Sequence, residues 1–147
     1  MYYSSRSATV IADASYCYQS GCGGYAYWVS VIGRRIKGSG RFKTKPLNHN
    51  DAEYKALMNG LHVATRDRNI KKVLLQTDSM ATVHQINKNL GFIKQFRQNR
   101  PDVYITARHV KGHVKQSDKR YKEPRYYVNS WCDKKAKEQM RKWRNEP

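Results

Sequence analysis

The spacing of apolar residues along the chain predicts strands first and a strand–helix alternation afterwards. Strand-like runs occupy residues 8–14, 24–32 and 35–43, and the glycines of the third run are typical of an edge strand. The period then becomes helical, and one helix face gathers Glu53, Ala56, Leu57, Gly60, Leu61 and Ala64. A strand at 72–77, a helix from about 79 to 89, a strand at about 103–108 and a helix at roughly 128–143 follow.

The order β-β-β-α-β-α-β-α predicts an α/β fold with a five-stranded mixed sheet, flanked by helices. Three antiparallel strands come first, and parallel strands joined by helices follow. The segment from Gly91 to Pro101 is interpreted as a plain connection. In open α/β sheets, ligands bind outside the carboxyl ends of strands where the strand order reverses. If the first and fourth strands are parallel neighbours, their carboxyl ends open into one crevice.

The length of 147 residues predicts a single domain spanning 1–147, with a polar lead at 1–7 and a basic loop at 109–127. No apolar run approaches the roughly 18 to 20 residues of a membrane span. The first residues also lack the apolar segment of a secretory signal. Three cysteines without zinc-ligand spacing fit a reducing compartment. We therefore expect a cytoplasmic monomer with no membrane partner.

The charge of the chain indicates its partner. Lys and Arg number 29 against 11 Asp and Glu, giving a formal charge of +18. A surface this positive attracts polyanions and speeds their association, so nucleic acid is the leading partner. The alternative is a solvated charged face that keeps the protein soluble.

Four acids stand out in a chain otherwise short of them. Asp13 and Asp78 end strand-like runs, whereas Glu53 and Asp133 lie on the apolar stripes of helical segments. Taken alone, Asp78 could cap a helix and Asp13 could begin a turn. A buried charge without a partner costs several kcal/mol, however, and the four together favour a ligand.

Four carboxylates in one cleft repel each other, and a pair of divalent cations resolves that repulsion. Mg²⁺ takes hard oxygen ligands and is held by a few carboxylates together with substrate phosphates. Two such ions about 4 Å apart activate a water and stabilise the leaving oxygen of a phosphoryl displacement. The acids therefore predict phosphodiester hydrolysis, with Lys and Arg holding the nucleic-acid backbone.

Five short segments, in one order along the chain, resemble those of type 1 ribonuclease H. They are Ile11-Ala-Asp13-Ala-Ser15 with Gly23-Gly24-Tyr25 after it, Asn50-Asp-Ala-Glu53-Tyr-Lys-Ala-Leu57, Thr77-Asp78-Ser79, Val110-Lys-Gly-His113 and Asn129-Ser-Trp-Cys-Asp133. Each segment alone is weak evidence, but together they cover nearly the whole chain.

The resemblance implies a ribonuclease H-like fold and a metal-dependent endonuclease that cuts the RNA strand of RNA–DNA hybrids, leaving 3′-hydroxyl and 5′-phosphate ends. It also implies residue roles. The four acids would coordinate two Mg²⁺ ions, with Mn²⁺ as a substitute, and His113 would assist proton transfer or product departure. His109 is the alternative candidate for this role, although its position is better explained as the end of a strand. The residues that would contact the substrate backbone are Ser15, Asn50, Ser79 and Asn129.

Two departures from the family pattern change the picture. Ala14 stands where members often have Gly, and the spacing from His113 to Asp133 is longer than usual. The chain also has no room for the long basic handle of some bacterial members. The added loop mixes aromatic and basic residues and is a candidate nucleic-acid contact in place of that handle. The alternative is a solvated loop without such a contact. Its candidate substrate-binding cations are Lys119, Arg120, Lys122 and Arg125.

Two rival functions use the same residues. One is a structure-specific DNA nuclease or resolvase of the same fold. The other is a catalytically silent basic module that binds nucleic acid.

Neutralising the four loop cations together should weaken hybrid binding more than it slows single-turnover cleavage, because each phosphate contact contributes a counterion-release term to affinity. Binding and cleavage rate measured on one hybrid check this. An unchanged affinity would remove the loop from the substrate path.

Overall fold

The computed structural model describes residues 6–110 and 124–146, with side chains in the second range from Tyr127 onward. Its elements are β1 (Ser7–Tyr16), β2 (Gly23–Val31), β3 (Arg34–Arg41), α1 (His49–Thr65), β4 (Lys72–Thr77), α2 (Met80–Asn87), α3 (Phe92–Asn99), β5 (Tyr104–His109) and α4 (Pro124–Arg144). The predicted order is confirmed except for α3, which the sequence reading did not include.

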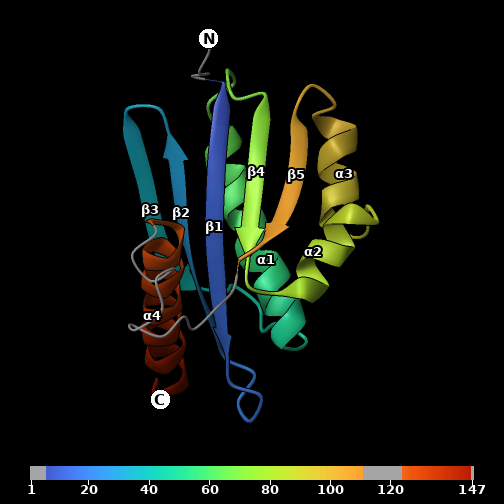
Figure 1. The fold of residues 1–147 in the computed structure, drawn as a ribbon. Helices are drawn as coiled ribbons and strands as arrows, with labels where there is room; N and C mark the ends of the chain where they lie inside the picture. The colour runs from blue at the N-terminus through green and yellow to red at the C-terminus, as the bar shows by residue number, and fades with distance from the viewer. Residues whose placement is uncertain (1–5, 111–123, 147) are drawn as a thin grey trace.

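The five strands form one mixed sheet in the order β3-β2-β1-β4-β5 (Figure 1). β1, β2 and β3 pair antiparallel, whereas β1–β4 and β4–β5 pair parallel. The predicted mixed sheet is therefore confirmed, and β1 and β4 are parallel neighbours, the condition on which a shared crevice depended. Their pairing ends at Ile11 and Gln76, so Asp13 and Asp78 each follow the last paired residue by two positions, and β1 continues past Asp13 to Tyr16.

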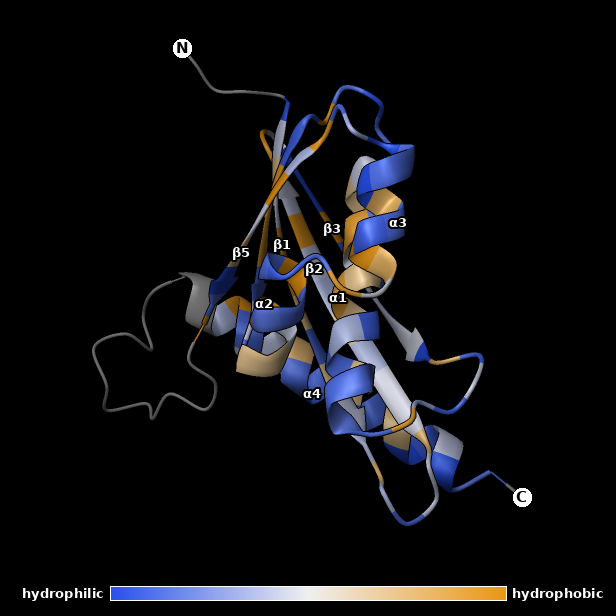
Figure 2. Ribbon diagram, turned by 90° about the vertical axis from the view of Figure 1, so that its right-hand side faces the viewer, coloured by the Kyte–Doolittle hydropathy of each residue, from blue (hydrophilic) through white to orange (hydrophobic). Residues whose placement is uncertain are grey.

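Alternation along β1 distributes the core over both faces of the sheet. Val10 and Ala12 join the larger core cluster with residues of α1, and Ile11 joins a smaller cluster with Trp28 and residues of α4. Figure 1 shows α1 behind the sheet and α4 in front of β1, β2 and β3. In Figure 2, hydrophobic colours run through the strands between the helices, and hydrophilic colours dominate the connecting loops. α4 contacts both β1 and β2, and its Ala136 and Met140 lie against Gly24, the partner of Ser15 near the end of β1.

The expectation of a plain connection from Gly91 to Pro101 is wrong, because α3 forms there. The helix is only 8 residues long, shorter than the window of about 11–18 residues over which a helical period is normally read, although its buried Ile93 and Phe96 have helical spacing. Tertiary contacts stabilise its start instead. The Tyr54 hydroxyl of α1 donates to the Leu90 carbonyl oxygen over 2.8 Å and accepts from the Ile93 amide over 2.7 Å.

The predicted basic loop at 109–127 is also too long at its end, because α4 begins at Pro124 rather than near residue 128. Proline is favoured in the first turn of a helix, where its missing amide hydrogen has no partner to lose. Residues 111–123 lie outside the described part of the chain. Among the residues that the structure does describe, no helix is long and apolar enough to cross a membrane.

Close packing at Gly24 sets the distance between α4 and the sheet. A Cβ atom at this position would meet the backbone of Ala136 and Met140 at distances that real Cβ atoms do not reach. Gly24 also pairs with Ser15 near the end of β1. The glycine therefore lets α4 approach the sheet beside the predicted site.

We expect Gly24→Ala to lower the free energy of unfolding by about 3 kcal/mol, because backbone atoms on α4 cannot yield as a side chain can. Urea unfolding of the two proteins measures the difference. Gly40→Ala is the matched control, since its new Cβ would meet only the far end of the Tyr25 side chain. Equal losses in the two variants would show that backbone contact with α4 is not the cause.

Candidate active site

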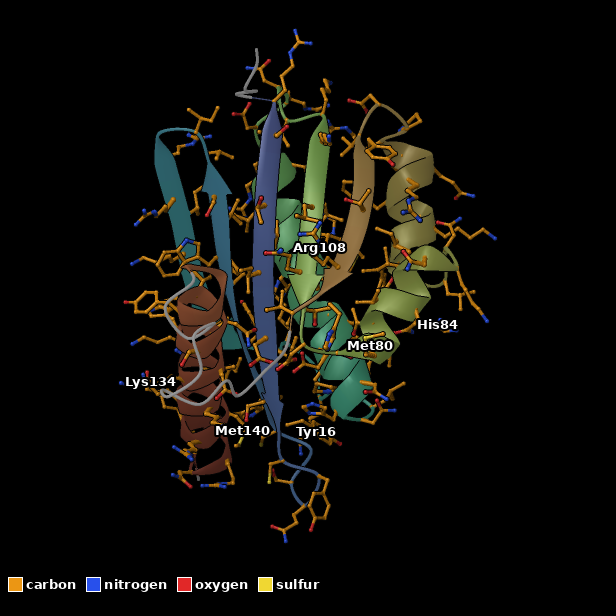
Figure 3. The ribbon with its side chains drawn as sticks, in the orientation of Figure 1. Tyr16, Met80, His84, Arg108, Lys134 and Met140 are labelled. Atoms are coloured by element: carbon orange, nitrogen blue, oxygen red, sulfur yellow. The ribbon has the colours of Figure 1, made fainter. Side chains whose placement is uncertain are left out.

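Three of the four predicted acids converge at one end of the sheet. Asp13 lies near the end of β1, Glu53 lies in α1, and Asp78 directly follows β4. One carboxylate oxygen from each lies within 4.8 Å of the other two. The sheet end is flanked by Tyr16 of β1, Met80 of α2 and Met140 of α4 (Figure 3).

The start of α1 is fixed by local hydrogen bonds that orient Glu53. The Asn48 side chain caps the helix by accepting from the Asp51 amide over 2.8 Å. The Asp51 carboxylate in turn accepts from the Leu47 amide over 2.8 Å. Because the helix starts at a defined residue, Glu53 falls on the face that packs against the sheet, where it is 1% exposed.

Asp13 and Glu53 share one backbone donor and leave two oxygens without a partner. The Ala14 amide donates to Asp13 Oδ1 over 2.9 Å and to Glu53 Oε1 over 3.0 Å. Asp13 Oδ2 and Glu53 Oε2 are buried and accept no hydrogen bond from the described residues. Such orphaned buried acceptors are uncommon in native structures and favour a missing ligand.

Burial is the main cause of the raised pKa of both carboxyl groups. For Asp13 the neighbouring Glu53 carboxyl lowers the pKa, and the charges of Asp78 and Asp133 raise it further. For Glu53 the next cause is the charge of Asp13. Bringing a cation between them would reverse this balance and favour both ionised forms. The donor set, carboxylate oxygens with unused acceptors, fits Mg²⁺ or a similar hard cation.

The fourth predicted acid, Asp133, lies on α4 outside this tight group of three. Its side chain is 26% exposed and forms an ion pair with Lys137, with Oδ2 and Nζ 3.0 Å apart. It is near enough for its charge to raise the pKa of both Asp13 and Cys132. The Cys132 thiol, which points to the Ile11 carbonyl oxygen of β1 over 3.6 Å, connects this part of α4 to the site strand.

The four predicted substrate-contacting residues lie around the acids. Ser15 is half-buried at the end of β1, and Asn50 is exposed in the first turn of α1. Ser79 caps α2, and its oxygen accepts from the amide and hydroxyl of Thr82 over 3.2 and 3.0 Å. Asn129 of α4 is 4% exposed, and its Oδ1 has no hydrogen-bond partner among the described residues.

The predicted histidine and loop cations are not placed by the structure. His113, Lys119, Arg120 and Lys122 lie outside the described residues, and Arg125 belongs to α4 without a described side chain. His109 is placed, at the end of β5, where its Nε2 lies 3.2 Å from the Asp78 carbonyl oxygen. This histidine therefore contacts the backbone of the site rather than its carboxylates.

The sequence reading missed a second histidine beside the acids. His49 Nε2 of α1 lies 3.7 Å from Glu53 Oε1, and the His49 side chain is 63% exposed. The spacing of four residues on a helix was the available signal, since such residues are neighbours on one helix face. The shared Ala14 donor had no sequence signal, because it depends on the backbone geometry at the end of β1.

A family model described as reverse transcriptase-like matches residues 12–111. This range includes Asp13, Glu53 and Asp78 and ends before Asp133. No curated protein matches the sequence significantly.

Solved structures share the fold at low sequence identity. RNase H1 from Halobacterium salinarum is 16% identical, with a TM-score of 0.66 over 92% of this chain and 98% of that one. LC11-RNase H1, in complex with an RNA/DNA hybrid, is 15% identical, with a TM-score of 0.68 over 94% and 99%. The N-terminal RNase H domain of a Mycobacterium tuberculosis protein is 18% identical, with a TM-score of 0.62 over 92% and 94%. The predicted ribonuclease H fold is thereby confirmed.

The raised pKa values predict how the stability of the metal-free protein depends on pH. The folded state holds more protons than the unfolded state above the ordinary values of 3.8 for Asp13 and 4.5 for Glu53. The free energy of unfolding contributed by these groups therefore falls as the pH rises from about 5 to about 8. We expect Asp13→Asn to reduce this fall by about 1–2 kcal/mol, because it removes one buried charge.

Thermal unfolding in a metal chelator at several pH values measures this effect. Mg²⁺ should raise the melting temperature of the unchanged protein at the higher pH and should do so much less for Asp13→Asn. Glu138→Gln, on the exposed side of α4, is the control. Identical pH profiles for the protein and Asp13→Asn would contradict the prediction.

Proposed function

The chain belongs to the reverse transcriptase-like family, and from that premise we propose that it is a metal-dependent endonuclease that hydrolyses the RNA strand of RNA–DNA hybrids. The observation that carries the proposal is the convergence of Asp13, Glu53 and Asp78 at the carboxyl ends of β1 and β4. The hybrid bound by LC11-RNase H1, which has the same fold, supports the substrate class.

Asp13, Glu53, Asp78 and Asp133 would hold two Mg²⁺ ions, for which Mn²⁺ could substitute. When bound, these ions supply the positive charge that activates the attacking water and stabilises the leaving oxygen of the phosphodiester. Two of these ligand atoms, Asp13 Oδ2 and Glu53 Oε2, are buried and have no other partner within the described part of the chain. The products would carry 3′-hydroxyl and 5′-phosphate ends.

The residues around the acids suit recognition of an RNA backbone. The Ser79 oxygen accepts two hydrogen bonds, so its own proton remains available to a substrate oxygen. The amides of Asn50 and Asn129 and the hydroxyl of Ser15 add donors and acceptors for a 2′-hydroxyl, the group that distinguishes RNA from DNA. His113 would assist proton transfer or product departure.

The charge of the chain complements this arrangement. The acid cluster is negative, whereas the protein as a whole carries a formal charge of +18. Lysine and arginine side chains would therefore hold the phosphates of the hybrid while the acids are neutralised by metal. Lys137 forms an ion pair with Asp133 and is one described cation that could contact a phosphate there.

A cleavage assay on uniformly labelled RNA–DNA hybrid, with and without Mg²⁺, tests the proposal. We expect cutting of the RNA strand only with metal, and a loss on the order of 10³-fold or more in Asp13→Asn, because a ligand and its charge are removed. Glu138→Gln should cut at the rate of the unchanged protein.

Two outcomes would contradict this function. Equal cutting of hybrid and duplex DNA would indicate a DNA nuclease of the same fold. Hybrid binding without metal-dependent cutting, unaltered by Asp13→Asn, would indicate a silent binding module.

A further inference from the structure

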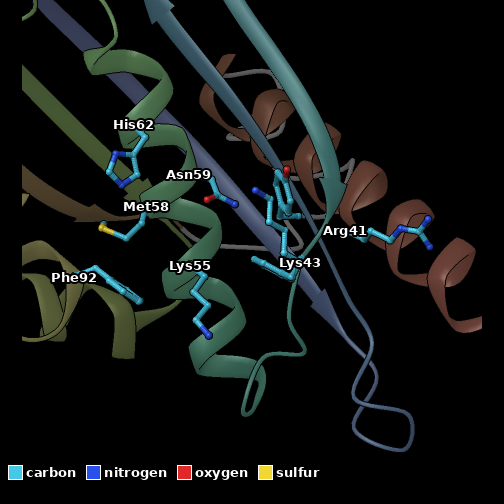
Figure 4. Close-up of a pocket in the computed structure, with 9 residues that line it drawn as sticks. Arg41, Lys43, Lys55, Met58, Asn59, His62 and Phe92 are labelled. Atoms are coloured by element: carbon cyan, nitrogen blue, oxygen red, sulfur yellow. The ribbon is translucent and has the colours of Figure 1, made fainter.

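A groove lies on the outward side of α1 (Figure 4), and its lining includes none of Asp13, Glu53 and Asp78. It has a volume of about 360 Å³, within the range of small-ligand sites. The residues that line it come from β2, β3, the segment after β3, α1 and α3: Tyr25, Arg41, Phe42, Lys43, Lys55, Met58, Asn59, His62 and Phe92.

The helical repeat separates this groove from the candidate active site. Lys55, Asn59 and His62 follow one another at spacings of four and three residues, so they share one face of α1. Glu53 precedes Lys55 by two residues, which turns it by about 200° around the helix axis. A molecule in the groove would therefore lie across α1 from the carboxylates.

The lining carries positive charge and no acid. Lys43 is exposed and forms no ion pair with the described residues, so its charge is available to a ligand. Lys55 pairs with Asp51 over 2.8 Å, and Arg41 pairs with Glu146, both acids lying outside the lining. This balance favours an anionic ligand that approaches Lys43 first.

Uncharged groups in the groove suit a planar ring. Phe92 is 53% exposed, and its ring stacks on Tyr54 with centroids 6.2 Å apart and planes 19° from parallel. The ring is thus held in place while much of it stays open. Asn59 and His62 offer hydrogen-bonding groups nearby, and burial lowers the pKa of His62, which favours the neutral ring with one donor and one acceptor.

We propose that this groove binds an unpaired nucleotide in a single-stranded flank of the nucleic-acid substrate. Lys43 and Lys55 contact its phosphates, and Phe92 and Asn59 contact its base. A phosphate needs the cations, and a base needs the aromatic surface and the amide, so a nucleic-acid strand is the ligand class that uses all of them. The proposal rests on the proposed function only in taking nucleic acid as the substrate.

Binding of hybrids with and without single-stranded ends tests this inference. The blunt hybrid is compared with hybrids that carry an overhang of about ten nucleotides, a typical single-strand site size, on each of the four strand ends in turn. Asp13→Asn serves as the background, so that the substrate stays intact. We expect at least one overhang to tighten binding by about tenfold, the effect of stacking roughly one base.

Single substitutions in the Asp13→Asn background test whether the gain in affinity from the overhang comes from the groove. Lys43→Gln and Phe92→Leu should each remove most of the gain and leave blunt-hybrid binding unchanged. Phe92→Leu keeps an apolar side chain over Tyr54, and the exposed Lys43 has no contact whose loss would unfold the protein. Arg68→Gln, an exposed cation outside the groove, is the matched control and should keep the full gain.

The inference is overturned if no overhang tightens binding, or if the gain survives in both Lys43→Gln and Phe92→Leu. A gain lost equally in Arg68→Gln would also overturn it, because general charge would then be the cause. Cleavage of the blunt hybrid by the unchanged protein is scored separately. Its absence would refute the proposed function, whereas the overhang comparison would still decide the role of the groove.

Discussion

The burial of two carboxyl groups, Asp13 and Glu53, is the constraint on which the rest of this structure depends. They are 2% and 1% exposed and share a single backbone donor, an arrangement that desolvation makes unfavourable for the charged forms. Packing elsewhere must offset that cost. β1 supplies this packing, because its residues are buried on both faces of the sheet. Val10 packs against α1, and Ile11 packs against Trp28 and α4. The strand that carries the first acid is thus also the centre of the core.

The fourth acid depends on how firmly α4 is held against the sheet. Trp28 of β2 contacts Trp131 of α4 edge-to-face at 5.4 Å, and Lys37 of β3 lies over both rings at 4.8 and 5.6 Å. Cation–π contacts of this kind are worth about 0.5–1 kcal/mol at exposed sites. Together with the close approach at Gly24, they fix the helix that carries Asp133. This aromatic cluster therefore also positions a candidate ligand.

The order of the elements other than α3, the mixed sheet and the convergence of three of the four predicted acids were predictable, because hydrophobic period places the acids at strand ends and on a buried helix face. α3 was not predicted, since an 8-residue helix is shorter than the window over which a period is read and the Tyr54 hydroxyl of a distant helix holds its first turn. The orphaned oxygens and the shared Ala14 donor depend on atomic geometry that residue spacing does not encode. His49 was within reach of sequence reasoning through its spacing of four from Glu53.

Helix α1 carries both sites on opposite sides, which decides what the groove can contribute. The helix packs closely on the sheet at Gly60, where an added Cβ would collide with the Val10 side chain. Close packing of this kind resists small displacements, because an interior at crystal-like density has little room to yield. A nucleotide bound beside Lys55 and Asn59 would therefore leave Glu53 where it is. The groove can add affinity and help select substrates with single-stranded ends, while the rate of the chemical step remains set by the acids.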